Sequence, residues 1–368
     1  MSDTPIVRAE GLVKDFGDVR AVDDISFEIE EGEFFSLVGP SGCGKTTTLR
    51  MIAGFDRPTA GDIYIQDERV TRAPPYDRDT GMVFQGYALF PHKTVGKNVG
   101  FGLKMDGVPE DERAERVADV LELVDLPGYE DRYPSELSGG QQQRIALARA
   151  LVIEPSVLLL DEPLSNLDLK LRKQMRFELQ RIQQELGVTT IYVTHDQEEA
   201  LSMSDRVLVM NEGEAEQIDD SLSIYNEPST RFVADFIGEA NLLEGTVVDR
   251  NETGIDVELD GVGMDARVET GNGDRIDRLS SGHEVTVSVR PENISLSRDV
   301  DGDPTRTNHV EGTIKSFTFL GKVTRFLIDV NGEEMLVEVP GRAGQQRFQN
   351  GQQVVVEWDP RESIVVGV

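Results

Sequence analysis

The segment GPSGCGKTTT, residues 39–48, combines closely spaced glycines with a lysine and hydroxyl side chains, and it follows the apolar run FFSLV. Glycines let the backbone curl so that successive N–H groups face phosphate oxygens, and the apolar spacing behind the loop predicts a helix whose N-terminus adds positive potential. Lys45 is expected to reach the β- and γ-phosphates of ATP, and Thr46 to coordinate Mg²⁺. A chance match to this spacing is expected on the order of once in a hundred chains of this composition. The expected nucleotide contacts are Gly39, Pro40, Ser41, Gly42, Cys43, Gly44, Lys45, Thr46 and Thr47.

A second apolar run ends in acidic residues that suit the same chemistry. VLLLDEP, residues 157–163, predicts a buried strand that delivers two carboxylates to the carboxyl edge of a sheet. We expect Asp161 to hold Mg²⁺ through water. Glu162 is expected to orient the attacking water, because an ordinary glutamate is ionised but only weakly basic at neutral pH. The alternative is that this acidic pair only begins a solvated loop.

Two further segments carry polar residues at informative places. IYVTHD, residues 191–196, ends an apolar run at His195; a single histidine is often structural, but this one falls at the predicted sheet edge, where we expect it to contact the γ-phosphate. LSGGQQQR, residues 137–144, contains no carboxylate, histidine or cysteine. Ser138 precedes an amphipathic pattern and predicts a helix N-cap. That local interpretation assigns the segment no chemistry of its own.

The elements that position these residues belong to a chain long enough for two domains: 368 residues, of which 38% are hydrophobic. No apolar run approaches the roughly 18 residues that a spanning helix needs, and the polar, acidic opening MSDTPIVRAE is not typical of an export signal. The single cysteine, Cys43, excludes an internal disulfide framework, and we interpret it as a small tolerated side chain rather than a redox site. We therefore expect a globular protein in the reducing cytosol.

Acidic residues dominate the composition, with 68 Asp and Glu against 37 Lys and Arg and a formal net charge of −31. The excess runs through the whole chain, and lysine is scarce relative to arginine. At molar salt a Debye length of about 3 Å screens such self-repulsion. The composition therefore favours a halophilic, archaeal host over the alternative of an acidic mesophilic protein. The charge also disfavours nucleic acid as a partner.

The order of the segments carries a family resemblance. The P-loop, LSGGQQQR, VLLLDEP, SNLD at 165–168 and THD stand in an order that resembles the ATP-binding cassette of ABC transporters. The resemblance implies an α/β P-loop NTPase fold over residues 1–238 and two cassettes that pack head to tail. Each LSGGQ signature would then cover the ATP held by the other subunit, which explains why it needs no catalytic acid. The residues concerned are Ser138, Gly139, Gly140 and Gln141.

Three more residues take their expected roles from the resemblance. Phe16 in KDFGD resembles the aromatic residue that stacks on adenine, although it could equally be a core residue. Gln85 in VFQGYALFPH resembles the glutamine that touches Mg²⁺ and the lytic water and senses the permease. Asp168 ends the segment that resembles the link between the two sites of the dimer. The expected metal contacts are thus Thr46, Gln85 and Asp161, and the expected catalytic residues are Glu162, His195 and Gln85.

Residues 86–156 are expected to form the helical subdomain of the cassette. Within it, VPEDERAERVADVLELVDL places apolar residues at Val117, Val120, Leu121 and Val124, a spacing that predicts an amphipathic helix. This arm would dock on a cytoplasmic loop of a membrane partner, unless its charged face is merely solvated. The aromatic and apolar YALFPH segment is the better candidate for the coupling surface.

After about residue 238, short β-rich runs with Gly, Asn and Asp turns replace the alternation of helix and strand. LLEGTVV at 242–248 recurs as HVEGTIK at 309–315, and VTVSVRPENISL recurs as VVVEWDPRESIVV. Two similar half-units predict a pair of small barrels over residues 239–368. VRPENI resembles the TOBE region of importer ATPases, which implies dimer contact and sometimes regulation or ligand sensing. Plain dimer stabilisation, with Trp358 in the core, is the simpler interpretation.

The resemblance implies the energy-coupling ATPase of an ABC importer, using ATP and Mg²⁺ at the cytoplasmic face of the cell membrane. Its partners would be a second cassette, identical or similar, two membrane permease subunits and, indirectly, an extracellular solute-binding protein. VTHDQEEALSMSDR and NEPSTRFVADFIGEANLL look most like the polyamine, ferric-iron, thiamine and anion importers, then the sugar importers; a polyamine is the best single solute. The rival hypothesis, a soluble ABC ATPase of DNA repair or translation, expects long coiled coils, zinc modules or a second cassette, which the sequence lacks.

Overall fold

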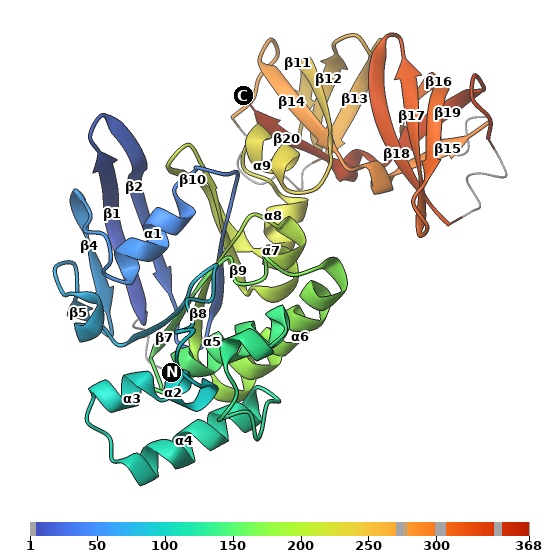
Figure 1. The fold of residues 1–368 in the computed structure, drawn as a ribbon. Helices are drawn as coiled ribbons and strands as arrows, with labels where there is room; N and C mark the ends of the chain where they lie inside the picture. The colour runs from blue at the N-terminus through green and yellow to red at the C-terminus, as the bar shows by residue number, and fades with distance from the viewer. Residues whose placement is uncertain (1–4, 270–275, 277, 299–306, 342–347, 368) are drawn as a thin grey trace. The chain divides into compact units, whose positions relative to one another are not determined.

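The computed structural model describes residues 5–269, 276, 278–298, 307–341 and 348–367. The chain divides into two compact units, Met1–Ser221 and Leu222–Val368, coloured from blue to green and from yellow to red in Figure 1. The sequence predicts a boundary after residue 238 instead. The difference arises because helix α9, Arg231–Phe236, contacts strands β14 and β20 of the second unit.

A six-stranded sheet forms the centre of the first unit, in the strand order β10-β9-β3-β8-β7-β6. Its inner strands β3, β8 and β7 read FFSLV, TTIYVT and VLLLD and are buried along almost their whole length, as expected for neighbouring parallel strands. β10 pairs with β9 antiparallel at one edge. The bounds are β3 Phe34–Val38, β6 Thr80–Val83, β7 Val157–Asp161, β8 Thr189–Thr194, β9 Arg206–Asn211 and β10 Glu214–Asp220, with helices α1 Lys45–Ile52, α6 Leu169–Leu186 and α7 Gln197–Met203.

A smaller antiparallel sheet, in the order β2-β1-β4-β5, also belongs to the first unit. Its long β1–β2 hairpin alternates buried and exposed residues, and register shifts interrupt β1 after Ala9, Leu12 and Lys14. The hairpin turn follows Phe16 at the end of β1, so the sheet carries this aromatic residue to its rim. The bounds are β1 Val7–Phe16, β2 Val19–Ile29, β4 Ala60–Ile65 and β5 Glu68–Arg69, followed by the short 3-10 helix η1 Pro75–Asp77.

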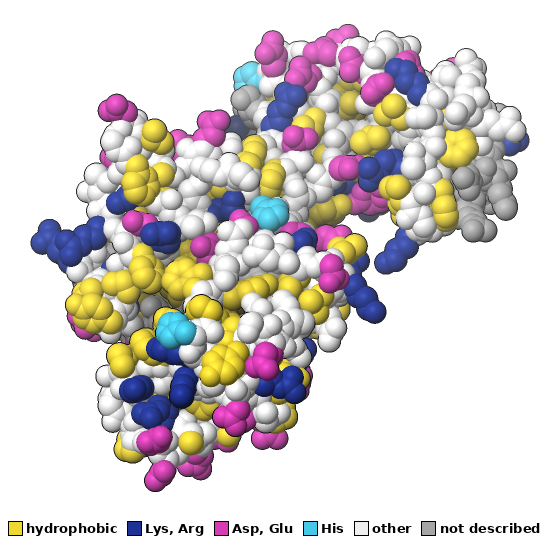
Figure 2. All heavy atoms as spheres, in the orientation of Figure 1, with side chains coloured by type: hydrophobic (Ala, Val, Ile, Leu, Met, Phe, Trp, Pro, Cys, Tyr) yellow, Lys and Arg dark blue, Asp and Glu magenta, His cyan; other side chains and the backbone are white. Residues whose placement is uncertain are grey.

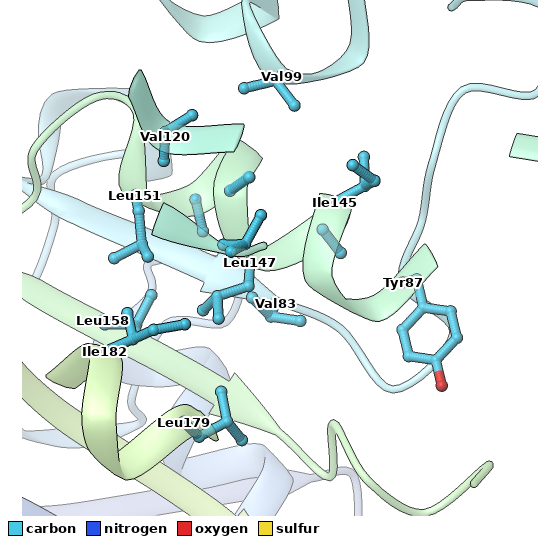
Figure 3. Close-up of a cluster of buried hydrophobic side chains, with 14 of the residues drawn as sticks. Val83, Tyr87, Val99, Val120, Ile145, Leu147, Leu151, Leu158, Leu179 and Ile182 are labelled. Atoms are coloured by element: carbon cyan, nitrogen blue, oxygen red, sulfur yellow. The ribbon is translucent and has the colours of Figure 1, made fainter. Parts of the chain in front are cut away.

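A group of helices lies between β6 and β7 in the sequence, within the predicted range 86–156. The predicted amphipathic helix is confirmed as α4, with Val117, Val120 and Leu121 buried, and Val124 is buried at its C-cap. These residues share one hydrophobic cluster with α5 and with residues of β7 and α6 (Figure 3), so the helices are anchored to the sheet. The bounds are α2 Val95–Val99, α3 Phe101–Met105, α4 Glu110–Leu123, η2 Pro134–Glu136 and α5 Gly139–Leu151.

The second unit contains two five-stranded antiparallel sheets, β13-β12-β11-β14-β20 and β15-β19-β16-β17-β18. Both sheets contribute to one hydrophobic cluster, in which Trp358 is buried as predicted. The bounds are α8 Ser221–Asn226, α9 Arg231–Phe236, β11 Asn241–Asn251, β12 Gly254–Leu259, β13 Met264–Glu269, β14 Glu284–Val289, η3 Pro291–Asn293, β15 Ile294–Ser297, β16 Asn308–Phe319, β17 Val323–Val330, β18 Glu333–Pro340, β19 Gln353–Trp358, η4 Pro360–Glu362 and β20 Ser363–Gly367.

The sequence repeat appears in the structure as an exchange of strands. Each repeat supplies four strands to its own sheet, β11 to β14 or β16 to β19, and then turns through a short 3-10 helix. The strand after that turn, β15 or β20, pairs with a strand of the other repeat. The half-units are therefore interlocked around a shared core rather than built as two separate barrels.

Two equivalent asparagines join the sheets. Asn241, at the start of β11, accepts the Leu336 N–H at 2.7 Å and donates to the Leu336 carbonyl at 2.9 Å. Asn308, at the start of β16, accepts the Arg267 N–H at 2.7 Å and donates to the Arg267 carbonyl at 2.8 Å. Both side chains are almost fully buried. Each side-chain amide thus pairs with the backbone of the edge strand of the other sheet, β18 or β13, as a neighbouring strand would.

Candidate functional site

The glycine loop follows the buried strand β3 and leads directly into α1. Two of its glycines lie where no side chain fits: a Cβ at Gly39 would lie 2.2 Å from the Met210 carbonyl oxygen, and one at Gly44 would lie 2.4 Å from that of Ala21. Gly44 also has a φ of 102°, in the left-handed region that favours glycine. The loop can therefore approach a phosphate closely with its backbone.

Lys45 is the buried cation of this loop. Its Nζ donates to the carbonyl oxygens of Gly39 at 2.7 Å and Pro40 at 2.8 Å, and lies 3.6 Å from Cys43 Sγ. Cys43 is buried in the same place. Neutral carbonyls are weaker partners for an ammonium group than phosphate oxygens are, so a triphosphate could replace them at this end of the side chain.

Asp161 and Thr46 lie beside the loop and contact each other. Thr46 Oγ1 donates to Asp161 Oδ1 at 3.0 Å, so the end of β7 meets the start of α1. Burial raises the pKa of the Asp161 carboxyl and the neighbouring charge of Glu162 adds to the rise, while the Thr46 hydrogen bond opposes it. A hydroxyl and a carboxylate next to a phosphate loop fit Mg²⁺, which keeps several waters and phosphate oxygens as its other ligands. The described residues contain no cluster of three or more His, Cys, Asp or Glu that could hold a metal ion.

Glu162 lies at the centre of the predicted catalytic residues. Its carboxylate accepts Gln85 Nε2 at 3.0 Å, and His195 Nδ1 lies 3.3 Å from the same oxygen. The Glu162 backbone has a φ of 44°, which is rare for a non-glycine residue, and its N–H donates to the Val193 carbonyl at 3.0 Å. Strained backbone of this kind is concentrated at functional sites. The structure thus brings together the three residues that the sequence nominates for catalysis.

The segment SNLD supports this group from the side. Asn166 Nδ2 donates to the Gln85 carbonyl at 2.8 Å, and Gln85 Nε2 lies 3.3 Å from Ser165 Oγ. Asp168 caps α6 by accepting the N–H groups of Lys170 and Leu171. The link that Asp168 is expected to make across a dimer stays a prediction. The contacts of Ser165 and Asn166 with Gln85 were not anticipated, because sequence spacing alone does not show which loops meet.

The signature segment begins α5. Ser138 is the predicted N-cap, confirmed by its Oγ accepting the Gln141 N–H, while Gln141 Oε1 accepts the Ser138 N–H at 2.9 Å. A Cβ at the exposed Gly139 would have its nearest neighbour at 3.6 Å, an ordinary contact distance, whereas one at Gly140 would lie 3.0 Å from the Leu171 side chain. Packing within the protomer therefore explains why a residue without a side chain stands at 140, but it does not explain the glycine at 139.

Phe16 lies at the rim of the small sheet with its side chain 51% exposed, so the alternative that it belongs to the core is wrong. Lys14 Nζ lies 4.8 Å from the centroid of its ring. An exposed aromatic ring can stack on a base, and the predicted contact with adenine stays open to test.

A buried network that the sequence did not indicate lies behind His195. Glu199, almost fully buried in α7, accepts the Tyr192 hydroxyl at 2.6 Å and the Thr194 hydroxyl at 2.8 Å. Asp196 caps α7, and Arg172 from α6 reaches Asp196 at 3.4 Å. These bonds fix the strand end and the helix on either side of His195. The sequence shows two adjacent glutamates shortly after Asp196, but their spacing does not indicate that one of them, Glu199, is buried and bonded to two hydroxyls.

A separate cavity of about 720 Å³ lies between α2, α3 and α4. Basic, acidic and apolar side chains all line it, the acidic ones being Glu110, Glu130 and Asp131, and Figure 2 shows Lys and Arg gathered over α2 and α3 next to hydrophobic side chains. Among the described residues, no helix is long and apolar enough to cross a bilayer. The lining includes Lys93, Lys97, Lys104, Arg113, Phe101, Met105 and Val117.

Comparison with known proteins agrees with the geometry. Residues 22–165 match the family described as ABC transporter, and residues 287–366 match the TOBE domain. The spermidine/putrescine import ATP-binding protein PotA of Rubrobacter xylanophilus is 48% identical over 98% of this chain and 93% of its own, and that of Thermobifida fusca is 47% identical over 94% and 88%. A solved dimeric ATP-binding cassette, in a post-hydrolysis state with ADP and Pi, is 33% identical with a TM-score of 0.53 over 58% of this chain and 98% of its own.

Proposed function

Because this chain belongs to the ABC transporter family and is an ABC-type ATP-binding subunit with a TOBE domain, we propose that it energises the import of a polyamine, spermidine or putrescine. Support comes from the similar spermidine/putrescine import ATP-binding proteins, which align with both units of the chain. The meeting of Glu162, Gln85 and His195 beside Thr46 and Asp161 supports ATP hydrolysis as the energy source. In the part of the chain that the structure describes, no feature favours the rival hypothesis of a repair or translation ATPase.

The hydrolytic step rests on positioning. Lys45 and the loop N–H groups would bind the phosphates, and Thr46 and Asp161 would hold Mg²⁺, which neutralises the developing charge when bound. Glu162 would orient a water in line with the γ-phosphorus, with Gln85 and His195 fixing its carboxylate. The water oxygen forms the new bond to phosphorus as the bond to the ADP oxygen breaks, so the products are ADP and phosphate.

We infer that the site is completed by a second cassette. Ser138 and the exposed Gly139 begin a helix whose N-terminal N–H groups suit a phosphate, yet packing within the protomer does not require Gly139. Two solved ATP-binding cassette structures of similar fold are dimeric. Turnover by a dilute protein should therefore rise more steeply than in proportion to its concentration.

Gly139→Asp tests this dimer. The exposed position has room for a side chain, so the melting temperature should hold, while a carboxylate facing the partner's ATP should lower turnover by about a hundredfold. Wild-type turnover strictly proportional to concentration, together with full activity of Gly139→Asp, would contradict the shared site.

We also propose that the cavity between α2, α3 and α4 receives a cytoplasmic loop of one permease subunit, which would keep the protein at the cytoplasmic face of the membrane. Its lysines suit an acidic loop and its apolar side chains suit an apolar face. An extracellular solute-binding protein would then act on this subunit only through the permeases.

The solute is tested by reconstituting the full chain with its permease subunits and binding protein in liposomes. We expect ATP turnover and uptake to rise with spermidine or putrescine outside, and not with ferric iron, thiamine, sulfate or maltose. Stimulation by one of those other solutes in place of both polyamines would contradict the polyamine proposal and leave the ATPase assignment intact.

A further inference from the structure

The loop that follows Gln85 has an unusual backbone. Tyr87 has a φ of 59° and Ala88 a φ of 48°, so two consecutive non-glycine residues lie in the left-handed region. Short bonds close the turn: the Tyr87 N–H donates to Phe84 at 2.8 Å and the Ala88 N–H to Gly86 at 2.6 Å. Such a conformation persists only where surrounding contacts hold it in place.

Arg149, in the last turns of α5, supplies those contacts. Its Nη1 donates to the Ala88 carbonyl at 2.6 Å and its Nη2 to the Tyr87 carbonyl at 2.8 Å. The planar guanidinium therefore grips the two strained peptide units with two parallel donors. Burial lowers the pKa of Arg149, which still remains protonated at neutral pH. Arg149 is half-buried and forms no salt bridge within the described part of the chain; its guanidinium lies 5.8 Å from the centroid of the Phe90 ring, and the two backbone carbonyls are its hydrogen-bond partners.

The Tyr87 ring makes a second connection to the same helix. It is buried in the hydrophobic cluster that also contains Ile145 and Leu147 of α5, and Figure 3 shows it at the margin of that cluster. The loop is thus fixed to α5 by its side chain and by its backbone. A movement of α5 would carry both contacts with it.

The contact between α5 and the loop joins two parts of the site, the signature segment at the start of α5 and the Gln85 amide beside Glu162. α5 starts directly after its N-cap, the signature residue Ser138, and carries Arg149 about 17 Å further along the helix axis, at about 1.5 Å per residue. On the other side of the gripped turn, Gln85 donates to Glu162, and its own carbonyl is held by Asn166. One residue, Gly86, separates Gln85 from the turn.

We propose that Arg149 is a positioning residue, which holds the left-handed turn at Tyr87 and Ala88 so that the Gln85 amide stays against Glu162, and which transmits displacements of the signature helix to that contact. This deepens the proposed function and rests on it. Arg149 touches neither nucleotide nor water in this account; it acts through Gln85.

The test compares Arg149→Ala with Arg181→Ala in the reconstituted transporter. Arg181, on α6, also donates to a backbone carbonyl, that of Leu123 at 3.0 Å, but it belongs to neither the signature segment nor the loop after Gln85. For Arg149→Ala we expect kcat per folded subunit to fall about tenfold or more with the KM for ATP changed less than about twofold, because only the reacting geometry is lost. The stimulation of turnover by transported solute should fall towards none. Arg181→Ala should keep both quantities within about twofold of wild type.

Arg149→Lys separates the forked grip from simple charge. One ammonium group cannot reproduce two parallel N–H donors, so we expect at most partial recovery. Full activity of Arg149→Lys, or a loss in Arg149→Ala that disappears once turnover is divided by the folded fraction from thermal melts, would overturn the proposal. If polyamines do not stimulate the wild-type transporter, the solute assignment is wrong. The difference in basal kcat between the two alanine variants would still test the role of Arg149.

Discussion

At the nucleotide edge of the first unit, Asp161 is a desolvated carboxylate with a raised pKa, Glu162 has left-handed backbone, and Lys45 is held by its own loop. In the second unit, the buried amides of Asn241 and Asn308 have donor and acceptor groups paired with neighbouring strands. Polar groups are buried in both regions. At the nucleotide edge the polar groups are arranged for a ligand, and their burial and backbone strain lower the stability of the fold. In the second unit the buried amides stabilise the fold itself.

Glu162→Gln should give the largest effect and sharpen this contrast. The amide keeps the shape but loses the charge that orients the water, so we expect ATP turnover to fall by about 10²- to 10⁴-fold. ATP binding should remain and the dimer should be trapped with nucleotide. The measurement is phosphate release beside equilibrium nucleotide binding and gel filtration. Unchanged turnover would remove Glu162 from its assigned role.

Asn241→Ala, in the second unit, should lower stability and leave ATP turnover unchanged, the reverse of Glu162→Gln. It leaves the half-buried N–H and carbonyl of Leu336 without their partner, so the free energy of unfolding should fall by about 1 to 3 kcal/mol. Trp358 is the single tryptophan and lies in this core, so its fluorescence during urea unfolding reports on this unit. ATP hydrolysis per folded subunit should hold.

The equivalent position provides the control. Asn308→Ala should cost a similar amount because it orphans the same groups on Arg267, while the exposed Gln353→Ala in β19 should change stability by less than about 0.5 kcal/mol. Equal stability of all three variants would show that the asparagine bridges do not hold the sheets together.

Asp161→Asn should stabilise the nucleotide-free protein modestly while abolishing its Mg²⁺-dependent turnover. The folded-state pKa of this carboxyl is raised, so the wild-type fold is penalised as pH rises through that pKa and the charge appears. The variant lacks that charge. Its advantage in melting temperature should therefore be absent below about pH 3.9, the ordinary value, and grow towards neutrality. A lower melting temperature at neutral pH would contradict the desolvation argument.

Salt should produce the smallest effect per residue, spread over both regions. The net charge of −31 repels itself, so lowering KCl from about 2 M to about 0.1 M should lower the melting temperatures of both units. Circular dichroism follows the whole chain and Trp358 fluorescence the second unit. Equal melting temperatures at the two concentrations would refute the inference of a halophilic host, which otherwise stays a prediction.

Short sequence patterns predicted those parts of the site whose structure is set by residues close to one another in the chain. The glycine loop before α1, the strand that ends at Asp161 and the N-cap at Ser138 each follow from a short segment. The family resemblance added Gln85, whose contact with Glu162 the structure then displays. These residues were accessible because strand ends and helix starts have their own sequence signals.

Contacts between distant segments were not accessible in the same way. Nothing near Arg149 or Asn166 in the sequence shows that each binds the backbone of the loop after β6. The strand exchange was also hidden, because a repeat reveals two similar units but not which unit pairs with β15 or β20. Alternation predicts a strand, whereas its partner depends on the whole fold.

The pairing of β20 with β14 has a consequence for folding. Val289 of β14 pairs with Ser363 of β20, 74 residues further along the chain, so this sheet closes only after the intervening repeat has been made and brought back to it. Until then one edge of β14 lacks its neighbouring strand and can pair with a strand of another chain. The exchange of strands therefore makes the two repeats fold as one cooperative unit.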